Sequence, residues 1–237
     1  MRQNEFGQPI GMAVENWTPR PFPSLKPMQG QYCSLEGLCP RKHGDQLFDA
    51  FGADPEGRNW TYLFDGPFDT RVDFDAWVER VSKTSDPLFY AIIDAKTERA
   101  VGVASFMRID PVTGVIEVGN IHFSSLLQKT PLATEAMFLM MRRAFDELGY
   151  RRYEWKCDSL NAPSRKAAAR FGFTFEGIFR KAIMYKGRSR DTAWFSIIDS
   201  EWPAIKAMFE TWLDASNFDE NGKQKNTLQE CAPERAE

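Results

Sequence analysis

Long apolar runs are missing from this sequence of 237 residues. The longest strongly apolar stretch, 136–141, is far shorter than the roughly 20 residues that a membrane-spanning helix needs. The first 30 residues contain no apolar core of the kind that secretory signal peptides carry. These absences argue against a membrane protein, and we expect a cytoplasmic protein that does not bind membranes.

Cysteine and histidine are scarce as well. The four cysteines form no C-x-x-C pair, and only His43 and His122 are available as imidazole ligands. This scarcity argues against a zinc site, so the sequence predicts no bound metal. Because cysteine is among the residue types most often buried, we expect reduced thiols that act as small core groups.

Charge of one sign is not concentrated anywhere along the chain. The formal net charge is −3, and no block of like charges is long enough to indicate a nucleic-acid-binding arm. This acidic balance argues against direct binding of nucleic acid. Neither G-x-G-x-x-G nor G-x-x-x-x-G-K-[ST] occurs, so dinucleotide-binding and P-loop folds lose their main support. The remaining profile, 43% hydrophobic and 27% charged residues, is typical of a soluble globular domain.

Composition divides the chain into three parts. Residues 1–29 form a proline-rich N-terminal arm, which we expect to grip its own domain or a neighbouring subunit of a homodimer. Residues 30–213 are predicted to form the folded domain. Residues 214–237 are mostly polar with few apolar anchors, so we expect a frayed C-terminal tail.

Hydrophobic periodicity in the central part predicts an α/β fold. The expected strands are 31–38, 88–94, 100–109, 114–123, 151–157, 173–186 and 191–199, and the expected helices are 40–52, 73–82, 131–148, 162–171 and 202–212. Short, turn-like links join the three strands between residues 88 and 123, which indicates an antiparallel meander. The whole order predicts a mixed sheet with helices on its faces.

The start of the helix expected at 131–148 carries donors and positive charge. Thr130 is a favoured N-cap residue, and Pro131 suits the first helical position. The first turn of a helix leaves backbone N–H groups unpaired and bears a partial positive charge, to which Lys129 adds a full charge. Such a terminus suits a phosphate, although most helix termini bind only water.

Two blocks of the sequence carry a resemblance to a known family. The first, Gln128 to Ala133, follows the pattern Gln or Arg, two residues, Gly, one residue, Gly or Ala. The second is N-x-x-S at Asn161 to Ser164, followed by A-x-x-x-G-F at Ala168 to Phe173. With these blocks, residues 30–213 resemble the Gcn5-related N-acetyltransferase (GNAT) superfamily, in particular its RimJ/RimL-like branch. One departure is Pro131, which replaces the usual central glycine and has no N–H to offer.

The resemblance implies a GNAT-type mixed, mostly antiparallel central sheet with helices on both faces. It also implies acetyl-CoA as co-substrate and a primary amine as acceptor, on a protein N-terminus, an amino acid or a small metabolite, attacked directly in a ternary complex. In the family, amides at the helix start hold the pyrophosphate, and two strands splay apart around the pantetheine chain, here 114–123 and 151–157. The cofactor-binding residues implied in this way are His122, Phe123, Gln128, Lys129, Thr130, Leu132, Ala133, Thr134, Asn161 and Ser164.

Two residues are candidates for proton transfer. The resemblance implies that Ser164 protonates the leaving thiolate while Asn161 bonds the pantetheine arm. Glu117, on the strand that leads to the phosphate loop, is the candidate base. Strict alternation would let only one of Glu117 and His122 face the amine unless a bulge intervenes. The plainer alternatives are that Asn161 and Ser164 only start a helix, and that Glu117 is an exposed glutamate paired with a lysine.

Further features have more than one interpretation. The aromatic residues between Trp60 and Phe68 fall where the family places its acceptor site, and packing against the N-terminal arm explains them equally well. Lys186, Arg188 and Arg190 are expected at a solvated hairpin tip, or else facing an acidic acceptor. Two alternatives to an enzyme also stay open, namely a catalytically silent CoA-binding or scaffolding module of the same fold and an RNA-associated accessory protein.

Overall fold

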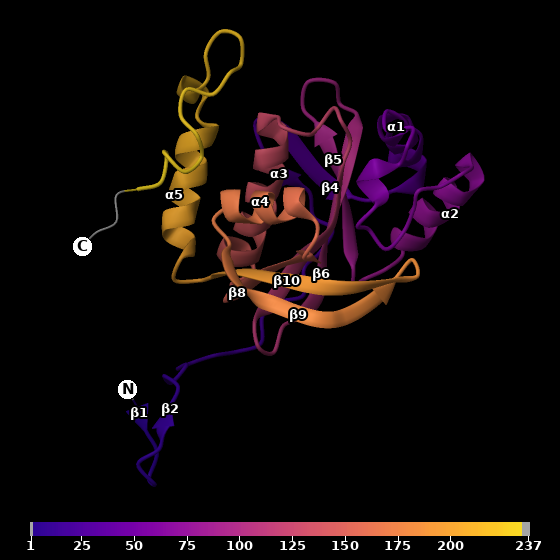
Figure 1. Cartoon of the computed structure of the whole chain (residues 1–237). Coiled ribbons are helices and arrows are strands. Elements are labelled where there is room, and N and C mark those ends of the chain that lie inside the picture. Colours follow the sequence, from indigo (N-terminus) through magenta and orange to yellow (C-terminus); the bar gives the residue numbers. More distant parts are fainter. Residues whose placement is uncertain (1, 234–237) are drawn as a thin grey trace.

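The computed structural model describes residues 2–233 and has a central sheet with helices on both faces (Figure 1). The sheet order is β3-β4-β5-β6-β7-β8-β10-β9, in which β7 and β8 are parallel and the other neighbours are antiparallel. Its strands are β3 (Met28–Gln29), β4 (Cys33–Gly37), β5 (Leu88–Asp94), β6 (Ala100–Asp110), β7 (Val115–Phe123), β8 (Arg152–Asp158), β9 (Thr174–Tyr185) and β10 (Arg188–Ile198). The predicted mixed, mostly antiparallel architecture is confirmed.

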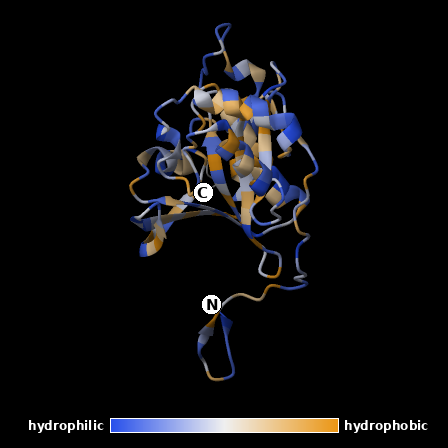
Figure 2. Ribbon diagram, turned by 90° about the vertical axis from the view of Figure 1, so that its right-hand side faces the viewer, coloured by the Kyte–Doolittle hydropathy of each residue, from blue (hydrophilic) through white to orange (hydrophobic). Residues whose placement is uncertain are grey.

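Two apolar cores lie on opposite faces of the sheet, and strand alternation creates them. In β5, Tyr90 and Ile92 belong to one core, whereas Phe89 and Ala91 belong to the other. Figure 2 shows apolar residues gathered where the helices meet the sheet. The first core is covered by α3 (Pro131–Arg142) and α5 (Trp202–Leu213), and the second by α1 (Pro40–Gly52) and α2 (Arg71–Val81). The remaining helices are η1 (Arg58–Trp60), η2 (Arg143–Glu147), α4 (Ala162–Arg170) and η3 (Ala215–Asn217).

The long helix predicted at 131–148 is present but changes its geometry near the end. Its α-helical part is α3, and the π-helical turn η2 continues it to Glu147. Gly149 follows with a φ of +71°, a left-handed conformation that glycine adopts without steric cost. The predicted stop at this glycine is confirmed. No helix within residues 2–233 is both long and apolar enough to span a membrane.

The N-terminal arm has two differently placed parts. A short hairpin of β1 (Arg2–Gln3) and β2 (Pro9–Ile10) lies away from the body of the molecule (Figure 1). Farther along, Trp17 donates its indole N–H to a carbonyl of the β6–β7 turn at 2.7 Å. The buried Arg143 donates to two consecutive carbonyls of the arm, both at 3.1 Å. The second part of the arm therefore binds its own domain.

The prediction of a frayed C-terminal tail is wrong for residues 214–233. Leu228 is fully buried, and Phe218 packs edge-on against Trp212 of α5 with ring centroids 5.2 Å apart. Gln229 also donates its side-chain amide to a carbonyl at the end of α4 at 2.8 Å. The few apolar residues of this segment therefore pack against the first core. Residues 234–237 lie outside the described part of the chain.

Candidate active site

A cavity opens where the two parallel strands of the sheet separate. Strands β7 and β8 pair from Val115 and Arg152 to Val118 and Trp155, and their pairing ends there. A cavity of about 850 Å³ begins at this point. The separation of these two strands, which the sequence predicted, is confirmed. Backbone groups beyond the last pair are left without a partner strand on this side.

A β-bulge in β7 turns extra side chains toward this cavity. Pairing with β6 shifts by one residue between Gly119 and His122. Asn120 in the bulge has a φ of +49°, and its side-chain amide donates to the Ser105 hydroxyl at 3.0 Å. Because the bulge interrupts the alternation, Glu117 and His122 both line the cavity. The sequence allowed this arrangement only if a bulge was present.

The start of α3 forms one end of the cavity. Thr130 is the N-cap residue and Pro131 the first helical residue, as predicted. The Thr130 hydroxyl accepts the N–H of Ala133 at 3.3 Å, a long and therefore weak bond that an anion would have to replace. Lys129, just before the cap, has a φ of +61°. Such left-handed backbone is costly for a side chain other than glycine and is often found at binding sites.

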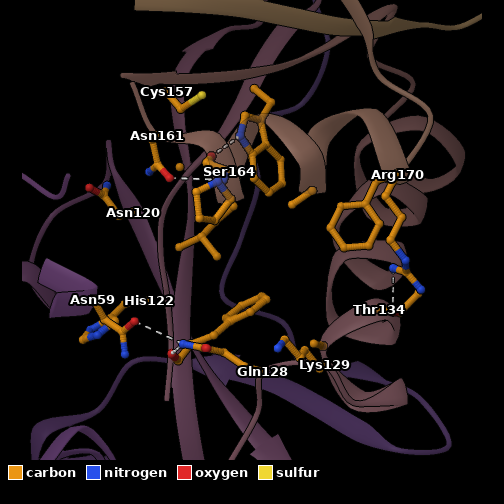
Figure 3. A pocket seen from close by; sticks show the side chains of 18 of the residues that line it. Asn59, Asn120, His122, Gln128, Lys129, Thr134, Cys157, Asn161, Ser164 and Arg170 are labelled. Carbon is orange, nitrogen blue, oxygen red and sulfur yellow. Dashed lines mark hydrogen bonds between the residues drawn. The ribbon is translucent and has the colours of Figure 1, made fainter. Parts of the chain in front are cut away.

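Cationic side chains gather around the same end. Arg170 of α4 donates to the Thr134 hydroxyl at 3.0 Å and lies over the ring of Trp212, 5.1 Å from its centroid (Figure 3). Lys223, from the C-terminal segment, also lines the cavity. Along residues 2–233, six cations and two carboxylates line it, namely Arg108, Lys129, Lys156, Arg170, Arg190 and Lys223 against Glu117 and Asp158. This excess of positive charge suits a ligand that carries phosphates.

Two further residues that were predicted to bind the cofactor at this end have side chains that support the structure. The Gln128 side-chain amide donates to the Phe123 carbonyl at 2.9 Å and to Asn59 at 3.2 Å, so it fixes the loop to the end of β7 (Figure 3). The Leu132 side chain is buried in the core and does not line the cavity. A contact of Leu132 with a ligand would therefore have to come from its backbone. Within the part of the chain that the structure covers, no cluster of His, Cys, Asp and Glu side chains forms a metal-binding group.

Asn161 and Ser164 lie together at the other end of the cavity (Figure 3). Asn161 is the N-cap residue of α4, and its side-chain oxygen accepts the Ser164 N–H at 3.1 Å. The Ser164 hydroxyl oxygen accepts the indole N–H of Trp155 at 3.0 Å, which leaves the hydroxyl hydrogen for another acceptor. The plainer alternative, helix initiation, is therefore right for the Asn161 oxygen. The Ser164 hydroxyl hydrogen remains available to an acceptor in the cavity, such as the neighbouring Cys157 sulfur.

Sequence analysis missed two cavity residues at the end of β8. Burial raises the pKa of the Cys157 thiol, and a hydrogen bond with Ser164 offsets a part of this rise. The Asp158 carboxylate is buried and accepts the Tyr185 hydroxyl at 2.8 Å and the Leu160 N–H at 2.9 Å. Their only sequence signal was a position directly at the end of a predicted strand beside the cleft.

The structure changes the interpretation of Glu117. Its side chain is only 3% exposed, so the expectation of an exposed glutamate is wrong. The predicted pairing with a lysine is right, because Lys156 lies 2.9 Å away, and Arg108 forms a second ion pair at 2.9 Å. Lys156 is itself buried and also pairs with Glu154 at 2.6 Å. Burial of this carboxylate is tolerated because two cations compensate its charge.

The His122 side chain belongs to the core more than to the cavity. Its ring stacks on Phe51 with centroids 3.9 Å apart and meets the edge of Trp60 at the same distance. Burial lowers the pKa of His122 from 6.5 to about 3. We therefore expect a neutral imidazole, and any contact with a cofactor would involve its backbone.

This burial predicts a measurable pH dependence of stability. Below pH 6.5 the unfolded chain binds a proton at His122 that the folded protein does not bind until about pH 3. Stability should therefore fall with falling pH across this window, by up to about 1.4 kcal/mol per pH unit from this residue. His122→Phe keeps an aromatic ring and should remove that part of the decline. Urea unfolding at several pH values tests this, and parallel pH curves for the two proteins would contradict it.

The aromatic residues between Trp60 and Phe68 have two different environments. Trp60 contacts Phe51, Phe68 and Trp77 in the core under α1 and α2. Packing against the N-terminal arm, the alternative from the sequence, is therefore wrong for Trp60. The residues that follow it, Tyr62 to Phe64, line the cavity, as the acceptor-site interpretation requires.

The basic hairpin between β9 and β10 is docked onto this loop. Lys186 donates to the carbonyls of Trp60 and Asp65 at 2.8 and 2.9 Å, and Arg188 donates to the Thr61 carbonyl. Arg190 is only 5% exposed and lines the cavity. Lys186 and Arg188 are exposed at the hairpin tip, as expected, although both also donate to this loop. These two cations thus hold one wall of the cavity, which the buried Arg190 lines.

Comparison with known proteins identifies the family. The family model described as "Acetyltransferase (GNAT) domain" matches residues 35–174, and this chain belongs to the GNAT family of acetyltransferase domains. A crystal structure of a GCN5-related N-acetyltransferase from Brucella melitensis is 52% identical, with a TM-score of 0.90 over 92% of this chain and 99% of that chain. A "probable" GNAT-family acetyltransferase from Chromobacterium violaceum is 39% identical, with a TM-score of 0.77 over 83% of this chain and 98% of that chain.

A curated relative is also similar over part of its length. The "Uncharacterized N-acetyltransferase p20" of Bacillus licheniformis is 30% identical over 113 residues, which are 48% of this chain and 63% of that protein. The chain therefore spans somewhat less than two thirds of this relative. The range matched by the family model, residues 35–174, contains both β7 and β8.

Proposed function

We propose that this protein transfers the acetyl group of acetyl-CoA to a primary amine by direct attack in a ternary complex. One observation carries the proposal: the cleft between β7 and β8 has a cationic helix start at one end and the Ser164 hydroxyl, which can donate its hydrogen, at the other. A thioester bound along this cleft would have its phosphates near the helix start. Its sulfur would then lie toward Ser164.

The residues present fit such a ligand. Lys129, Arg170 and Lys223 would neutralise phosphate charge, and the backbone N–H groups of 132–134 would donate to phosphate oxygens. Pro131 contributes no N–H, and the Thr130 hydroxyl competes for one of those that remain. In β7, residues beyond Val118 would pair with the amide groups of the pantetheine chain, and Asn161 would donate its free side-chain N–H groups. Bound acetyl-CoA supplies an activated acetyl group to the site.

Proton transfer then falls to side chains of this chain. An amine must lose a proton as it attacks, and the departing thiolate must gain one. Ser164 would give its hydroxyl hydrogen to the thiolate, while Glu117 would take the proton from the amine, directly or through a water molecule. The raised pKa of Cys157 argues against an acetyl-cysteine intermediate, because the thiol, not the reactive thiolate, is favoured.

Calorimetry and steady-state kinetics test this function together. We expect acetyl-CoA to bind, thiol to be released with a suitable amine, and initial-velocity lines to intersect, as a ternary complex requires. Cys157→Ser should retain turnover. Parallel lines together with an inactive Cys157→Ser variant would instead support an acetyl-enzyme. Binding of acetyl-CoA without thiol release on any amine would support the silent CoA-binding module. The absence of a backbone N–H at Pro131 favours that alternative.

The proposed base has a close control within the same ion-pair network. Glu117→Gln should shift the pH optimum of turnover, because the proton acceptor is lost. Glu154→Gln removes the other carboxylate partner of Lys156 and does not line the cavity, so it should lower stability and leave the pH profile unshifted. Turnover measured as a function of pH for both variants tests this prediction. If Asp158→Asn moves the profile and Glu117→Gln does not, the base is Asp158.

Finer assignments rest on the sequence alone. The RimJ/RimL-like branch follows from the quoted motifs. A structure described as a "putative ribosomal-protein-serine acetyltransferase" from Vibrio cholerae is only 16% identical, so its similarity concerns the fold. We also propose a cytoplasmic location, where acetyl-CoA and amine acceptors meet.

A further inference from the structure

Arg190 is a buried cation whose charge is not neutralised by an ion pair. It is 5% exposed and lines the cavity. Its Nε donates to the Thr192 hydroxyl at 3.1 Å. Its two terminal nitrogens make no hydrogen bond to residues 2–233, and no carboxylate of those residues lies within 4.0 Å of it as an ion pair. A buried charge without a partner is costly, so its retention needs an explanation.

The acid with the strongest electrostatic effect on Arg190 is not its ion-pair partner. Asp158 is the group whose charge acts most strongly on Arg190, but its two oxygens already accept bonds from Tyr185 and from the Leu160 backbone. Burial lowers the pKa of Arg190, as expected for a guanidinium removed from water without full compensation. The other pocket carboxylate, Glu117, is paired with Lys156 and Arg108.

Two aromatic rings lie beside the Arg190 guanidinium. Its guanidinium carbon lies 5.6 Å from the centroid of the Phe64 ring and 5.9 Å from that of Tyr185. These two rings contact each other edge-on at 5.6 Å, and Lys186 and Arg188 hold the loop that carries Phe64. The guanidinium is thus fixed by aromatic walls, and its terminal nitrogens remain available.

Arg190 also lies close to the proposed point of acetyl transfer. Arg190 precedes Thr192 on β10 by two residues, and Thr192 pairs with Asp158 at the end of β8. Arg190, Cys157 and Ser164, the proposed proton donor, all line the same cavity, so an anion bound to Arg190 would share that cavity with the reacting amine. A carboxylate matches the fork of a guanidinium, which can donate two parallel hydrogen bonds.

We propose that Arg190 binds a carboxylate of the acceptor, so that the acceptor is a small amine carrying a nearby carboxylate, as in an amino acid. This inference rests on the proposed function and narrows its acceptor. In an amino acid the carboxylate beside the amine is free, whereas at a protein N-terminus the corresponding carboxyl group is part of a peptide bond. The inference therefore distinguishes amino-acid-like acceptors from protein N-termini.

Matched ligand pairs test this inference by binding as well as by turnover. The probes are phenylalanine, methionine and serine, each compared with its primary carboxamide, titrated into the protein loaded with CoA. The proteins are wild type, Arg190→Met, Arg190→Lys and the control Arg180→Met, whose arginine is exposed on β9. The amines of each pair differ in basicity, so the measured quantity is the acid-to-amide affinity ratio and its change between proteins.

We expect wild type and Arg180→Met to prefer the acid of at least one pair by roughly tenfold. Arg190→Met should lose this preference, and Arg190→Lys should keep a part of it, because one ammonium cannot form the paired contact. A wild-type protein without preference, including one that binds none of the acids, would overturn the inference. An acid preference that survives in Arg190→Met would also overturn it. The same holds if Arg190→Met lowers turnover of both the acid and the amide while the acid-to-amide affinity ratio stays unchanged.

The failure of the proposed function would look different. It would appear as absent acetyl-CoA binding or absent thiol release with all amines, whereas the acid-to-amide ratio comes from calorimetry. If Arg190→Met unfolds, Arg190→Lys still has to reduce the ratio while Arg180→Met preserves it.

Discussion

Replacing Ser164 by alanine is expected to lower turnover about a hundredfold and to leave acetyl-CoA affinity nearly unchanged. The reason is the orientation of the hydroxyl. Trp155 donates its indole N–H to the Ser164 oxygen at 3.0 Å, so the hydroxyl hydrogen is directed to another acceptor. If that acceptor is the departing thiolate, the group acts only as the C–S bond breaks. Steady-state kinetics combined with calorimetry separates the two quantities.

A serine between β8 and α4 provides the control. Ser159 is half-buried and does not line the cavity, so Ser159→Ala should preserve turnover. Turnover of Ser164→Ala equal to that of wild type would remove the proton-donor role. An equal loss of turnover and of CoA affinity would instead assign Ser164 to binding. Trp155→Phe, which removes the donor to Ser164, should lower turnover less than Ser164→Ala does.

Replacing Glu135 by glutamine is expected to destabilise the protein by about 3 kcal/mol, roughly 10 °C in melting temperature. Glu135 of α3 is 5% exposed, and its carboxylate accepts three backbone N–H groups, those of Gln31, Tyr32 and Cys33, at 2.7, 2.6 and 2.7 Å. Hydrogen bonds to a charged acceptor are the stronger kind. A glutamine brings an N–H₂ group against donors and leaves at least one buried amide unpaired.

An exposed glutamate of the same domain gives the matched comparison. Glu210→Gln on α5 makes the same chemical change at the surface and should alter stability by less than about 0.5 kcal/mol. Thermal and urea unfolding of the two variants test the difference. Similar melting temperatures for Glu135→Gln and wild type would mean that the three amides find other acceptors.

The position of Glu135 also connects stability with the site. It lies one turn into α3, whose start forms one end of the cavity, and it ties this helix to the chain entering β4 (Cys33–Gly37). Gly30 is required beside it, because an added Cβ would lie 2.4 Å from the carboxyl carbon. Loss of this contact should therefore weaken acetyl-CoA binding as well, through a less rigid helix start.

Local signals in the sequence were sufficient for most elements of the fold. Thr130 and Pro131 marked the start of α3 and Gly149 marked its stop, because caps and left-handed glycines act over a few residues. The meander of β5, β6 and β7 followed from short links between alternating strands. Periodicity did not resolve the tail after 213, because a single buried Leu228 among polar residues leaves no repeat to detect.

Some residues of the candidate site were likewise found from local motifs, and others only in the tertiary structure. The sequence motifs by themselves located the start of α3 at 128–133 and the pair Asn161 and Ser164 at the start of α4, since these residues interact with neighbours a few positions away. Only the tertiary structure decided that Glu117 is buried between two cations and that Arg190 lies in the cavity without an ion-pair partner among residues 2–233. Those environments come from strands far apart in the sequence. Burial and charge pairing are properties of what surrounds a residue, and a linear pattern does not contain them.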